Sequence, residues 1–222
     1  EDHEILPADT KQHLLQQTST MLAEVFDKRA YERLVEPYKN VLPDVTLRLA
    51  DWIAHCPADI IDKVKQSTST MATGMAEWVR KNWHIQSKED LDDYTYYVAG
   101  LVGVMLSDIW YWHDKTETDR DLAIAFGRGL QAVNILRNQK EDSERGVAFF
   151  PDGWNRTDMF HYAATHLHLA DEYIKDIRNT NILSFCKIPL ALAKKTLNVL
   201  KNGKEKLSRY EVETVVSRVT NS

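Results

Sequence analysis

Apolar residues recur at helical spacing along most of this 222-residue chain, and no segment shows the regular alternation of a half-buried strand. Only 8 Gly and 6 Pro interrupt the pattern. Breaks are predicted at short turn-forming segments, for example Pro151-Asp152-Gly153 and Asn202-Gly203. The pattern predicts an all-α fold with helices at residues 8–27, 30–38, 44–54, 57–82, 87–113, 119–142, 155–178, 180–201 and 206–220.

None of the breaks is long enough to be a linker, so we expect one domain spanning residues 1–222. With 43% hydrophobic residues, the chain can bury a sizeable core. The tetrapeptide Thr-Ser-Thr-Met occurs at Thr18–Met21 and again at Thr68–Met71, but four residues are too few to predict a repeat. No run of about 18 apolar residues predicts a membrane-spanning helix.

The segment from Phe126 to Pro151 carries the most informative polar pattern. At about 3.6 residues per turn, Asn134, Asn138 and Asp142 fall at i, i+4 and i+8 on one face of the predicted helix. Mg²⁺ takes oxygen ligands, commonly one or two carboxylates from the protein together with water and substrate phosphate. The pattern therefore fits a diphosphate site. It also fits the solvent-facing side of an amphipathic helix, which periodicity alone favours.

The formal net charge of −5 disfavours nucleic acid as a partner. An acidic protein can still bind an anionic diphosphate when Mg²⁺ lies between its carboxylates and the ligand. The two cysteines, Cys56 and Cys186, are too few for a disulfide framework, so we expect a cytoplasmic protein.

Several segments, in order along the chain, resemble the squalene and phytoene synthase family of head-to-head prenyl synthases. The second acidic motif of that family is matched by Gln131, Asn134, Arg137, Glu141 and Asp142. Asn138 stands where the family usually has an aspartate. The other matches are YTYYVAGLVG at 94–103, SFCKIP at 184–189 and GMAEW at 74–78, and the squalene branch is the closer one.

This resemblance implies an isoprenoid synthase-type helical bundle around a central cavity. The first residues, EDHEILP, resemble the end of the family's first acidic motif, so Glu1 and Asp2 would be its last two members. On this basis we expect about two further helices before residue 1. Eukaryotic relatives carry a C-terminal membrane anchor, and a hydrocarbon product would suit peripheral contact with a membrane.

The resemblance also implies an activity, the head-to-head condensation of two farnesyl diphosphates through presqualene diphosphate, with reduction by NADPH to squalene. Mg²⁺ would be held by Glu1, Asp2, Asn134, Asn138 and Asp142. Arg137 would take part in catalysis, and Gln131 and Glu141 would contact the substrate. Asn138 could coordinate through its carbonyl oxygen with reduced cation affinity, or could make only an outer contact.

Tyr94 matches the tyrosine proposed in the family to move a proton during cyclopropyl ring closure, and Tyr97 lies one turn later. Each could instead be a core tyrosine with its hydroxyl satisfied. Phe185 matches an aromatic residue whose ring face can stabilise a carbocation. The apolar wall around the prenyl chain would be formed by Val98, Ala99, Leu101, Val102, Leu130 and Cys186. Gly100 and Gly103 would allow close helix approach or leave room for the chain, and plain packing explains them equally well.

The C-terminal basic residues Lys204, Lys206 and Arg209 resemble a stretch linked to NADPH, although a solvated helix end is the more frequent meaning of such a run. Trp110 and Trp112 are expected to cap the bundle or to touch a membrane surface. Relatives usually carry an arginine at the position of Val147, and Arg145 could substitute for it.

The departures from the family pattern at Asn138 and Val147 leave three alternative functions open. The first is a non-reducing head-to-head synthase that makes presqualene diphosphate, hydroxysqualene or a carotenoid precursor. The second is a farnesyl diphosphate phosphatase. The third is a non-catalytic relative that binds prenyl lipids. The sequence does not determine the oligomeric state.

Overall fold

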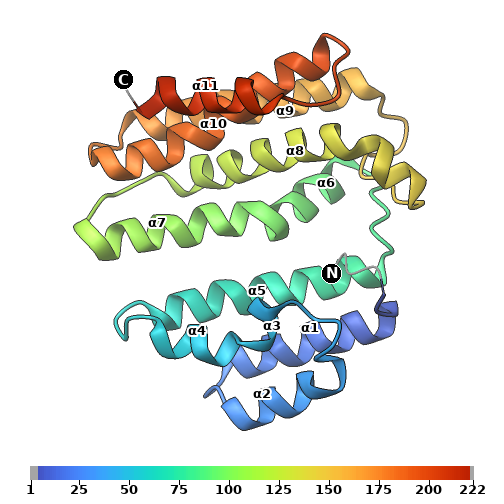
Figure 1. Cartoon of the computed structure of the whole chain (residues 1–222), viewed down its shortest axis with the longest axis vertical. Coiled ribbons are helices and arrows are strands. Elements are labelled where there is room, and N and C mark those ends of the chain that lie inside the picture. Colours follow the sequence, from blue (N-terminus) through green and yellow to red (C-terminus); the bar gives the residue numbers. More distant parts are fainter. Residues whose placement is uncertain (1–4, 221–222) are drawn as a thin grey trace. The chain divides into compact units, whose positions relative to one another are not determined.

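The computed structural model describes residues 5–220, and every regular element in that range is helical (Figure 1). The predicted fold class is therefore confirmed. None of the helices within the described range is long and apolar enough to cross a bilayer. The chain forms two compact units, Glu1–Trp83 and His84–Ser222. One domain spanning residues 1–222 stays a prediction.

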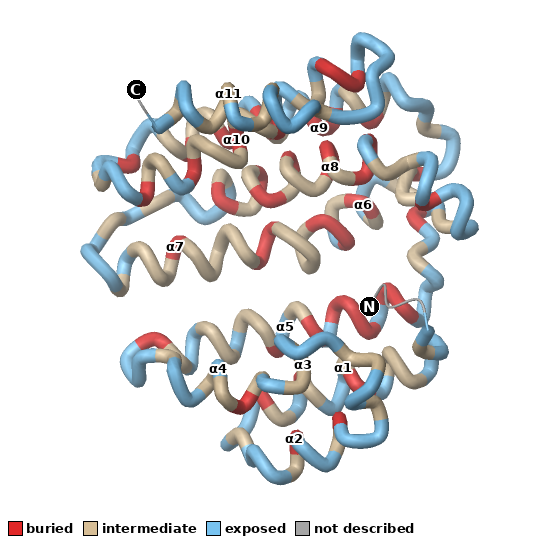
Figure 2. The backbone as a smooth tube through the Cα atoms, viewed as in Figure 1, coloured by how far each residue is buried: buried red, intermediate tan, exposed pale blue. Residues whose placement is uncertain are grey.

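The first unit is built around two long antiparallel helices, α1 and α5, which pack on each other. Its core includes Leu22, Met75 and Trp78, and in Figure 2 the buried positions of α5 gather in its C-terminal half. The elements of this unit are α1 (Ala8–Ala23), α2 (Lys28–Val35), the 3₁₀ turn η1 (Glu36–Tyr38), α3 (Asp44–Leu47), α4 (Leu49–His55) and α5 (Ile61–Arg80).

The two copies of Thr-Ser-Thr-Met meet across the α1–α5 contact. Ser19 Oγ donates to the carbonyl oxygen of Ser69 at 2.9 Å, and Ser69 Oγ donates to the carbonyl oxygen of Ser19 at 2.9 Å. The Thr73 hydroxyl lies 2.7 Å from Ser19 Oγ. Buried hydroxyls need such partners, and small side chains let the two backbones approach closely. The repeated tetrapeptide therefore marks a helix–helix contact.

The second unit is organised around α8, which contacts η2, α7, α9 and α10. Small and branched apolar residues on its inner faces pack against α9, and the core of this contact contains Ala132, Ile135, Leu136, Met159, Ala163, Leu167 and Ala170. The elements are α6 (Lys88–Thr95), the π-helical turn η2 (Tyr96–Gly100), α7 (Leu101–Asp114), α8 (Arg120–Glu144), α9 (Arg156–Lys175), α10 (Thr180–Lys201) and α11 (Arg209–Thr220).

Side-chain caps determine where the longest of these helices begin. Asp119 accepts a hydrogen bond from the backbone N–H of Leu122 at 2.9 Å. Asn155 and Asp158 form a reciprocal capping box, and Asn179 caps α10. The predicted helices 119–142, 155–178 and 180–201 consequently agree with α8, α9 and α10 to within three residues at each end.

Two predicted helices are interrupted in the structure. The helix predicted at 44–54 is divided at Arg48 into α3 and α4. The helix predicted at 87–113 contains the π-helical turn Tyr96–Gly100. A single wide turn hardly changes a hydrophobic pattern averaged over many residues, so periodicity alone does not reveal it.

Candidate active site

Helix α8 carries the polar face that the sequence predicts. It remains helical from Arg120 to Glu144, so Asn134, Asn138 and Asp142 lie on successive turns. The two asparagines are half-buried, and Asp142 is 6% exposed. A carboxylate this deeply buried needs a charged or hydrogen-bonding partner.

Two arginines provide such partners along the face. Arg137 Nη2 donates to Asn134 Oδ1 at 2.6 Å, and its Nε donates to Asn138 Oδ1 at 3.1 Å. Arg145 Nη2 donates to Asp142 Oδ1. Each of the three candidate oxygen ligands thus already accepts a hydrogen bond from a guanidinium. A metal ion that used these oxygens would have to share them with the arginines or displace the arginines.

The donor set is suited to one hard cation that is also bound by a ligand phosphate. Asp142 supplies one carboxylate and the two asparagines supply neutral amide oxygens, whereas Mg²⁺ usually takes one or two protein carboxylates. Within residues 5–220, no group of three or more His, Cys, Asp and Glu side chains could hold a metal ion. Glu1 and Asp2, the other predicted ligands, lie outside the described residues.

The loop after α8 carries Val147 at the position where relatives usually have an arginine. The Val147 N–H donates to the carbonyl oxygen of Asp142 at 3.0 Å, which closes the loop tightly onto the helix end. Arg145, two residues earlier, turns back and pairs with the Asp142 carboxylate. A guanidinium is therefore present at the motif, although it comes from a different position of the loop.

The tyrosine segment lies close to the same loop. Tyr94 is 3% exposed, and its ring stacks on Phe149 with centroids 4.9 Å apart and an interplanar angle of 22°. Tyr97 is half-buried, and its ring meets Tyr96 edge-on at 5.4 Å. The Phe149 stack holds the Tyr94 ring against the loop that follows Asp142. Catalytic roles for Tyr94 and Tyr97 stay predictions.

Glycines bring this segment against α8. A Cβ on Gly127 would lie 2.3 Å from the carbonyl oxygen of Ala99, and one on Gly103 would lie 2.2 Å from that of Ala123. Both distances are far below van der Waals contact, so only glycine allows the two backbones to cross here. Gly103 allows this close helix approach and also lines the apolar pocket next to the crossing.

Beside this crossing lies an apolar pocket of about 300 Å³. The predicted wall residues Val98, Ala99, Val102, Leu130 and Cys186 line it, together with Phe185. Leu101 is buried but does not line the pocket. Burial raises the pKa of the Cys186 thiol to about 11, so this group stays protonated and weakly nucleophilic at neutral pH.

Further aromatic residues complete the wall, and none of them was predicted from the sequence to line it. Trp110, which the sequence predicts to cap the bundle or to touch a membrane surface, lines the pocket and meets Phe185 edge-on, with centroids 5.5 Å apart. Phe126 and Tyr173 also line it and meet edge-on at 5.7 Å. A helical-spacing signal was available, because Phe126 lies four residues before Leu130 and Pro189 lies four residues after Phe185.

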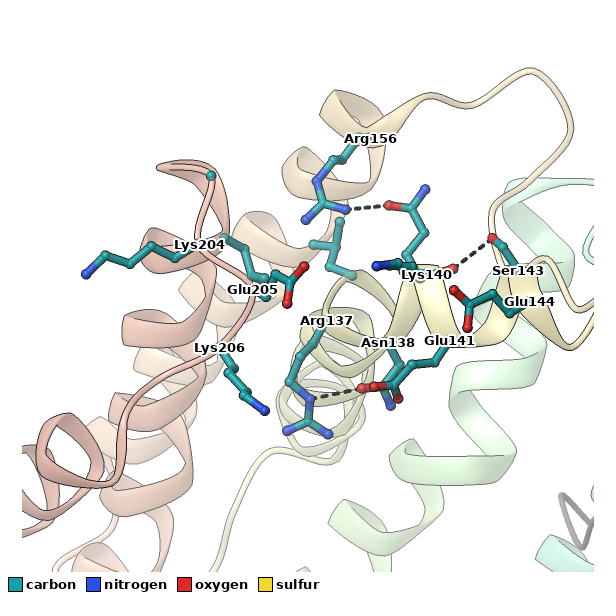
Figure 3. Close-up of a pocket in the computed structure, with 14 residues that line it drawn as sticks. Arg137, Asn138, Lys140, Glu141, Ser143, Glu144, Arg156, Lys204, Glu205 and Lys206 are labelled. Atoms are coloured by element: carbon teal, nitrogen blue, oxygen red, sulfur yellow. Dashed lines mark hydrogen bonds between the residues drawn. The ribbon is translucent and has the colours of Figure 1, made fainter.

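A separate polar groove of about 970 Å³ lies beside the C-terminal half of α8 (Figure 3). Lys204 and Lys206, predicted from the resemblance to bind NADPH, line this groove, and Arg209 does not. Arg137, Asn138 and Glu141 of the motif line it as well. Gln131 is half-buried and lines neither the groove nor the apolar pocket.

Squalene synthases are among the known proteins with similar sequences. Squalene synthase from Dictyostelium discoideum is 30% identical over 214 residues, covering 85% of this chain and 48% of the relative. Squalene synthase from Rattus norvegicus is 27% identical over 223 residues, covering 86% of this chain and 48% of the relative. The chain thus spans about half the length of these curated relatives.

Solved structures agree with the fold. The complex of TcSQS with the ligand E5700 matches with a TM-score of 0.74 at 21% identity, covering 97% of this chain and 72% of that chain. The TcSQS complex with BPH1237 gives a TM-score of 0.71 at 20% identity. These matches confirm the all-α isoprenoid synthase fold. A model of the squalene/phytoene synthase family matches residues 1–158. Because this match covers well over half of the chain, the protein belongs to the squalene/phytoene synthase family.

Proposed function

We propose that this protein condenses two farnesyl diphosphates head to head through presqualene diphosphate and reduces that intermediate to squalene with NADPH. One observation carries the proposal. Steps of four residues along α8 lead from Phe126 and Leu130, which line the apolar pocket, to Asn134, Asn138 and Asp142. One helix thus offers a hydrocarbon surface followed by a polar one, as an amphiphilic prenyl diphosphate requires.

The charged half of the ligand is bound at the polar end of this stripe. Asn134, Asn138 and Asp142 would hold Mg²⁺, which supplies stabilisation of the charge that develops on the departing diphosphate. Arg137 and Arg145 already lie at these oxygens and would turn their N–H groups to the diphosphate, since guanidinium pairs well with phosphate oxygens. The Tyr94 hydroxyl would move the proton lost during cyclopropyl ring closure.

The apolar half of the ligand is enclosed by the pocket. Phe185 and Trp110 present aromatic surface that stabilises a carbocation without capturing it. The raised pKa of Cys186 keeps that neighbouring thiol from becoming a thiolate that an allylic cation would alkylate. NADPH supplies the hydride of the second step, and Lys204, Lys206 and Arg209 would bind its phosphates.

Phe185→Ala is expected to slow the second half-reaction more than the first, because its ring face is needed only while the rearranging carbocation exists. The loss in the second step should be roughly 30-fold, which corresponds to the about 2 kcal/mol of a desolvated cation–π contact. Single-turnover assays that start from farnesyl diphosphate or from presqualene diphosphate separate the two steps. Phe185→Leu keeps the apolar volume and serves as a control for the ring itself. Equal losses in both steps would remove the special role of Phe185.

Asn138→Asp is expected to lower the Mg²⁺ concentration that gives half-maximal activity, because a carboxylate attracts the cation more strongly than an amide. The measurement is a Mg²⁺ titration of turnover. Gln139→Glu adds the same charge at the next residue, whose side chain faces Arg156, and is the matched control. An unchanged titration for Asn138→Asp would place this residue outside the coordination sphere.

The whole proposal is tested by mass spectrometry of the products formed from farnesyl diphosphate and Mg²⁺, with and without NADPH. Squalene formed only with NADPH is the expected result. Presqualene diphosphate or hydroxysqualene under both conditions would identify a non-reducing synthase. Farnesol alone would identify a phosphatase, and the absence of any product would favour a non-catalytic prenyl-lipid-binding protein.

A further inference from the structure

A buried polar cluster joins the end of α6 to α8 and α9, and we call it the α6 anchor. It consists of Asp92, Thr95, Arg128 and Tyr162. The Tyr162 hydroxyl donates to Asp92 Oδ1 at 2.7 Å and lies 3.2 Å from Thr95 Oγ1. Arg128 Nη2 donates to the carbonyl oxygen of Asp92 at 2.9 Å. None of the four residues lines the apolar pocket or the polar groove, so a ligand in either of them does not account for the cluster.

The tyrosine of the anchor is oriented by two aromatic neighbours. Tyr162 is 5% exposed, and its ring meets Trp154 edge-on with centroids 6.0 Å apart. Its ring also packs on that of His166, with centroids 4.2 Å apart. A buried ring that contacts two other rings has little rotational freedom, so the hydroxyl stays directed at Asp92.

The charge states of the anchor suit a fixed contact. Burial acts to raise the pKa of the Asp92 carboxyl, but hydrogen bonds from Lys88 and Tyr162 outweigh burial and hold this pKa below its usual range. Burial raises the pKa of Tyr162, so its hydroxyl remains a donor. Asp92 is therefore a permanent acceptor and Tyr162 a permanent donor at neutral pH. This pairing favours holding a helix in place over acid–base catalysis.

The anchor acts on the turn that leads into the π-helical segment η2. The carbonyl oxygen of Asp92 accepts from Arg128 and also from the Tyr96 N–H at the end of α6. The Thr95 hydroxyl, which is fully buried, donates to the carbonyl oxygen of Leu91 at 2.6 Å. A π-helical turn is a rare structure that recurs at functional sites. Side chains from α8 and α9 thus fix the backbone immediately before such a turn.

Tyr94 lies within the fixed turn, between two residues of the anchor. Its ring stacks on Phe149, which holds the side chain but not the backbone of α6. A small rotation of α6 would move the Tyr94 hydroxyl. Through η2 it would also move Val98 and Ala99, which line the apolar pocket.

We propose that the α6 anchor is a set of positioning residues that holds Tyr94 in the orientation needed for cyclopropyl ring closure. The inference rests on the role of Tyr94 in the proposed function. Tyr162 is the residue best suited to a test, because replacement by phenylalanine removes only the hydroxyl and keeps both ring contacts. The loss should therefore slow the reaction without weakening the binding of substrate.

Hydrogen exchange followed by mass spectrometry tests the anchor without any substrate. Tyr162→Phe should speed exchange at residues 92–100 about tenfold, because local opening becomes easier. The matched control is Tyr31→Phe in the first unit, where a buried tyrosine hydroxyl donates to the carbonyl oxygen of Thr46 at 2.8 Å. Each variant loses one buried hydrogen bond and should melt about 2–4 °C lower. Exchange at residues 92–100 that is unchanged in Tyr162→Phe, or equally fast in both variants, would overturn the proposal.

Single-turnover formation of presqualene diphosphate tests the link to Tyr94. Tyr162→Phe should slow this step about tenfold, since small misplacements of reacting groups are costly. Its affinity for the slowly reacting analogue farnesyl thiodiphosphate should stay within about twofold of the wild-type value, because the hydroxyl touches neither pocket nor groove. In a Tyr94→Phe background the same change should cause no further loss, because Tyr162 acts through Tyr94.

An unchanged rate in Tyr162→Phe, or additive losses in the double variant, would show that the anchor does not act through Tyr94. If the wild-type protein forms no presqualene diphosphate, the proposed function fails. The exchange measurement then decides by itself whether Tyr162 holds the turn before η2.

Discussion

Asp142→Ala should abolish Mg²⁺-dependent turnover. Asp142 is the one carboxylate among the three oxygens on the polar face of α8, and neither asparagine can supply its negative charge. Loss of metal-assisted stabilisation of a departing diphosphate amounts to several kcal/mol, which corresponds to a rate loss of about 10³-fold. The measurement is the steady-state rate of farnesyl diphosphate consumption at saturating Mg²⁺.

Two further variants distinguish the loss of the negative charge of Asp142 from a loss of helix structure. Asp142→Asn keeps the volume and can still accept a hydrogen bond from Arg145, so it should fold normally and still lose activity. Asp121→Ala removes an exposed carboxylate from the first turn of the same helix and should leave turnover within about twofold. Activity that survives in both Asp142 variants would refute its assignment as a metal ligand.

Gly127→Ala should destabilise the second unit strongly. The added methyl group would lie 2.3 Å from the Ala99 carbonyl oxygen, 2.6 Å from its carbon and 2.8 Å from the Gly100 nitrogen. All three are backbone atoms, so relief requires the two helices to separate. Overpacking of this kind costs about 3 kcal/mol, which outweighs the gain of about 1 kcal/mol that alanine brings to a helix. The melting temperature should fall by roughly 4–8 °C.

Thermal unfolding followed by circular dichroism measures this effect, and Gly100→Ala provides the control. There the added methyl group would meet Ile124 Cγ2 at 3.1 Å and Tyr96 Cδ2 at 3.2 Å, which are side-chain atoms that can shift. Its stability should change by less than about 1 kcal/mol, since the helix gain offsets a small adjustment. A melting temperature for Gly127→Ala as high as that for Gly100→Ala would show that the helix crossing is not rigid.

The repeated tetrapeptide shows why some helix–helix contacts cannot be predicted from the sequence. Thr18–Met21 and Thr68–Met71 are too short to predict a structural relation, yet Ser19 and Ser69 exchange hydrogen bonds between α1 and α5. Such pairing depends on how two helices are rotated and aligned against each other. Local periodicity contains no information on that alignment.

The arginines near Asp142 give a second example. The sequence leaves open whether Arg145 substitutes for the arginine that relatives usually carry at Val147 or whether that contact is missing. The structure shows an ion pair between Arg145 and Asp142, next to a tight loop closed by the Val147 N–H. Turn geometry of this kind depends on a few backbone hydrogen bonds rather than on residue type.

The sequence by itself determined the helical fold class, the starts of α8, α9 and α10, and the single face that carries Asn134, Asn138 and Asp142. These follow from local rules, because capping residues act within one turn and side chains four apart share a face. Only the tertiary structure decided the glycine crossing of η2 with α8, the aromatic wall beside Phe185 and the groove that gathers Lys140, Arg156 and Lys206. Each of these joins segments far apart in the chain, and their contacts depend on how whole helices pack.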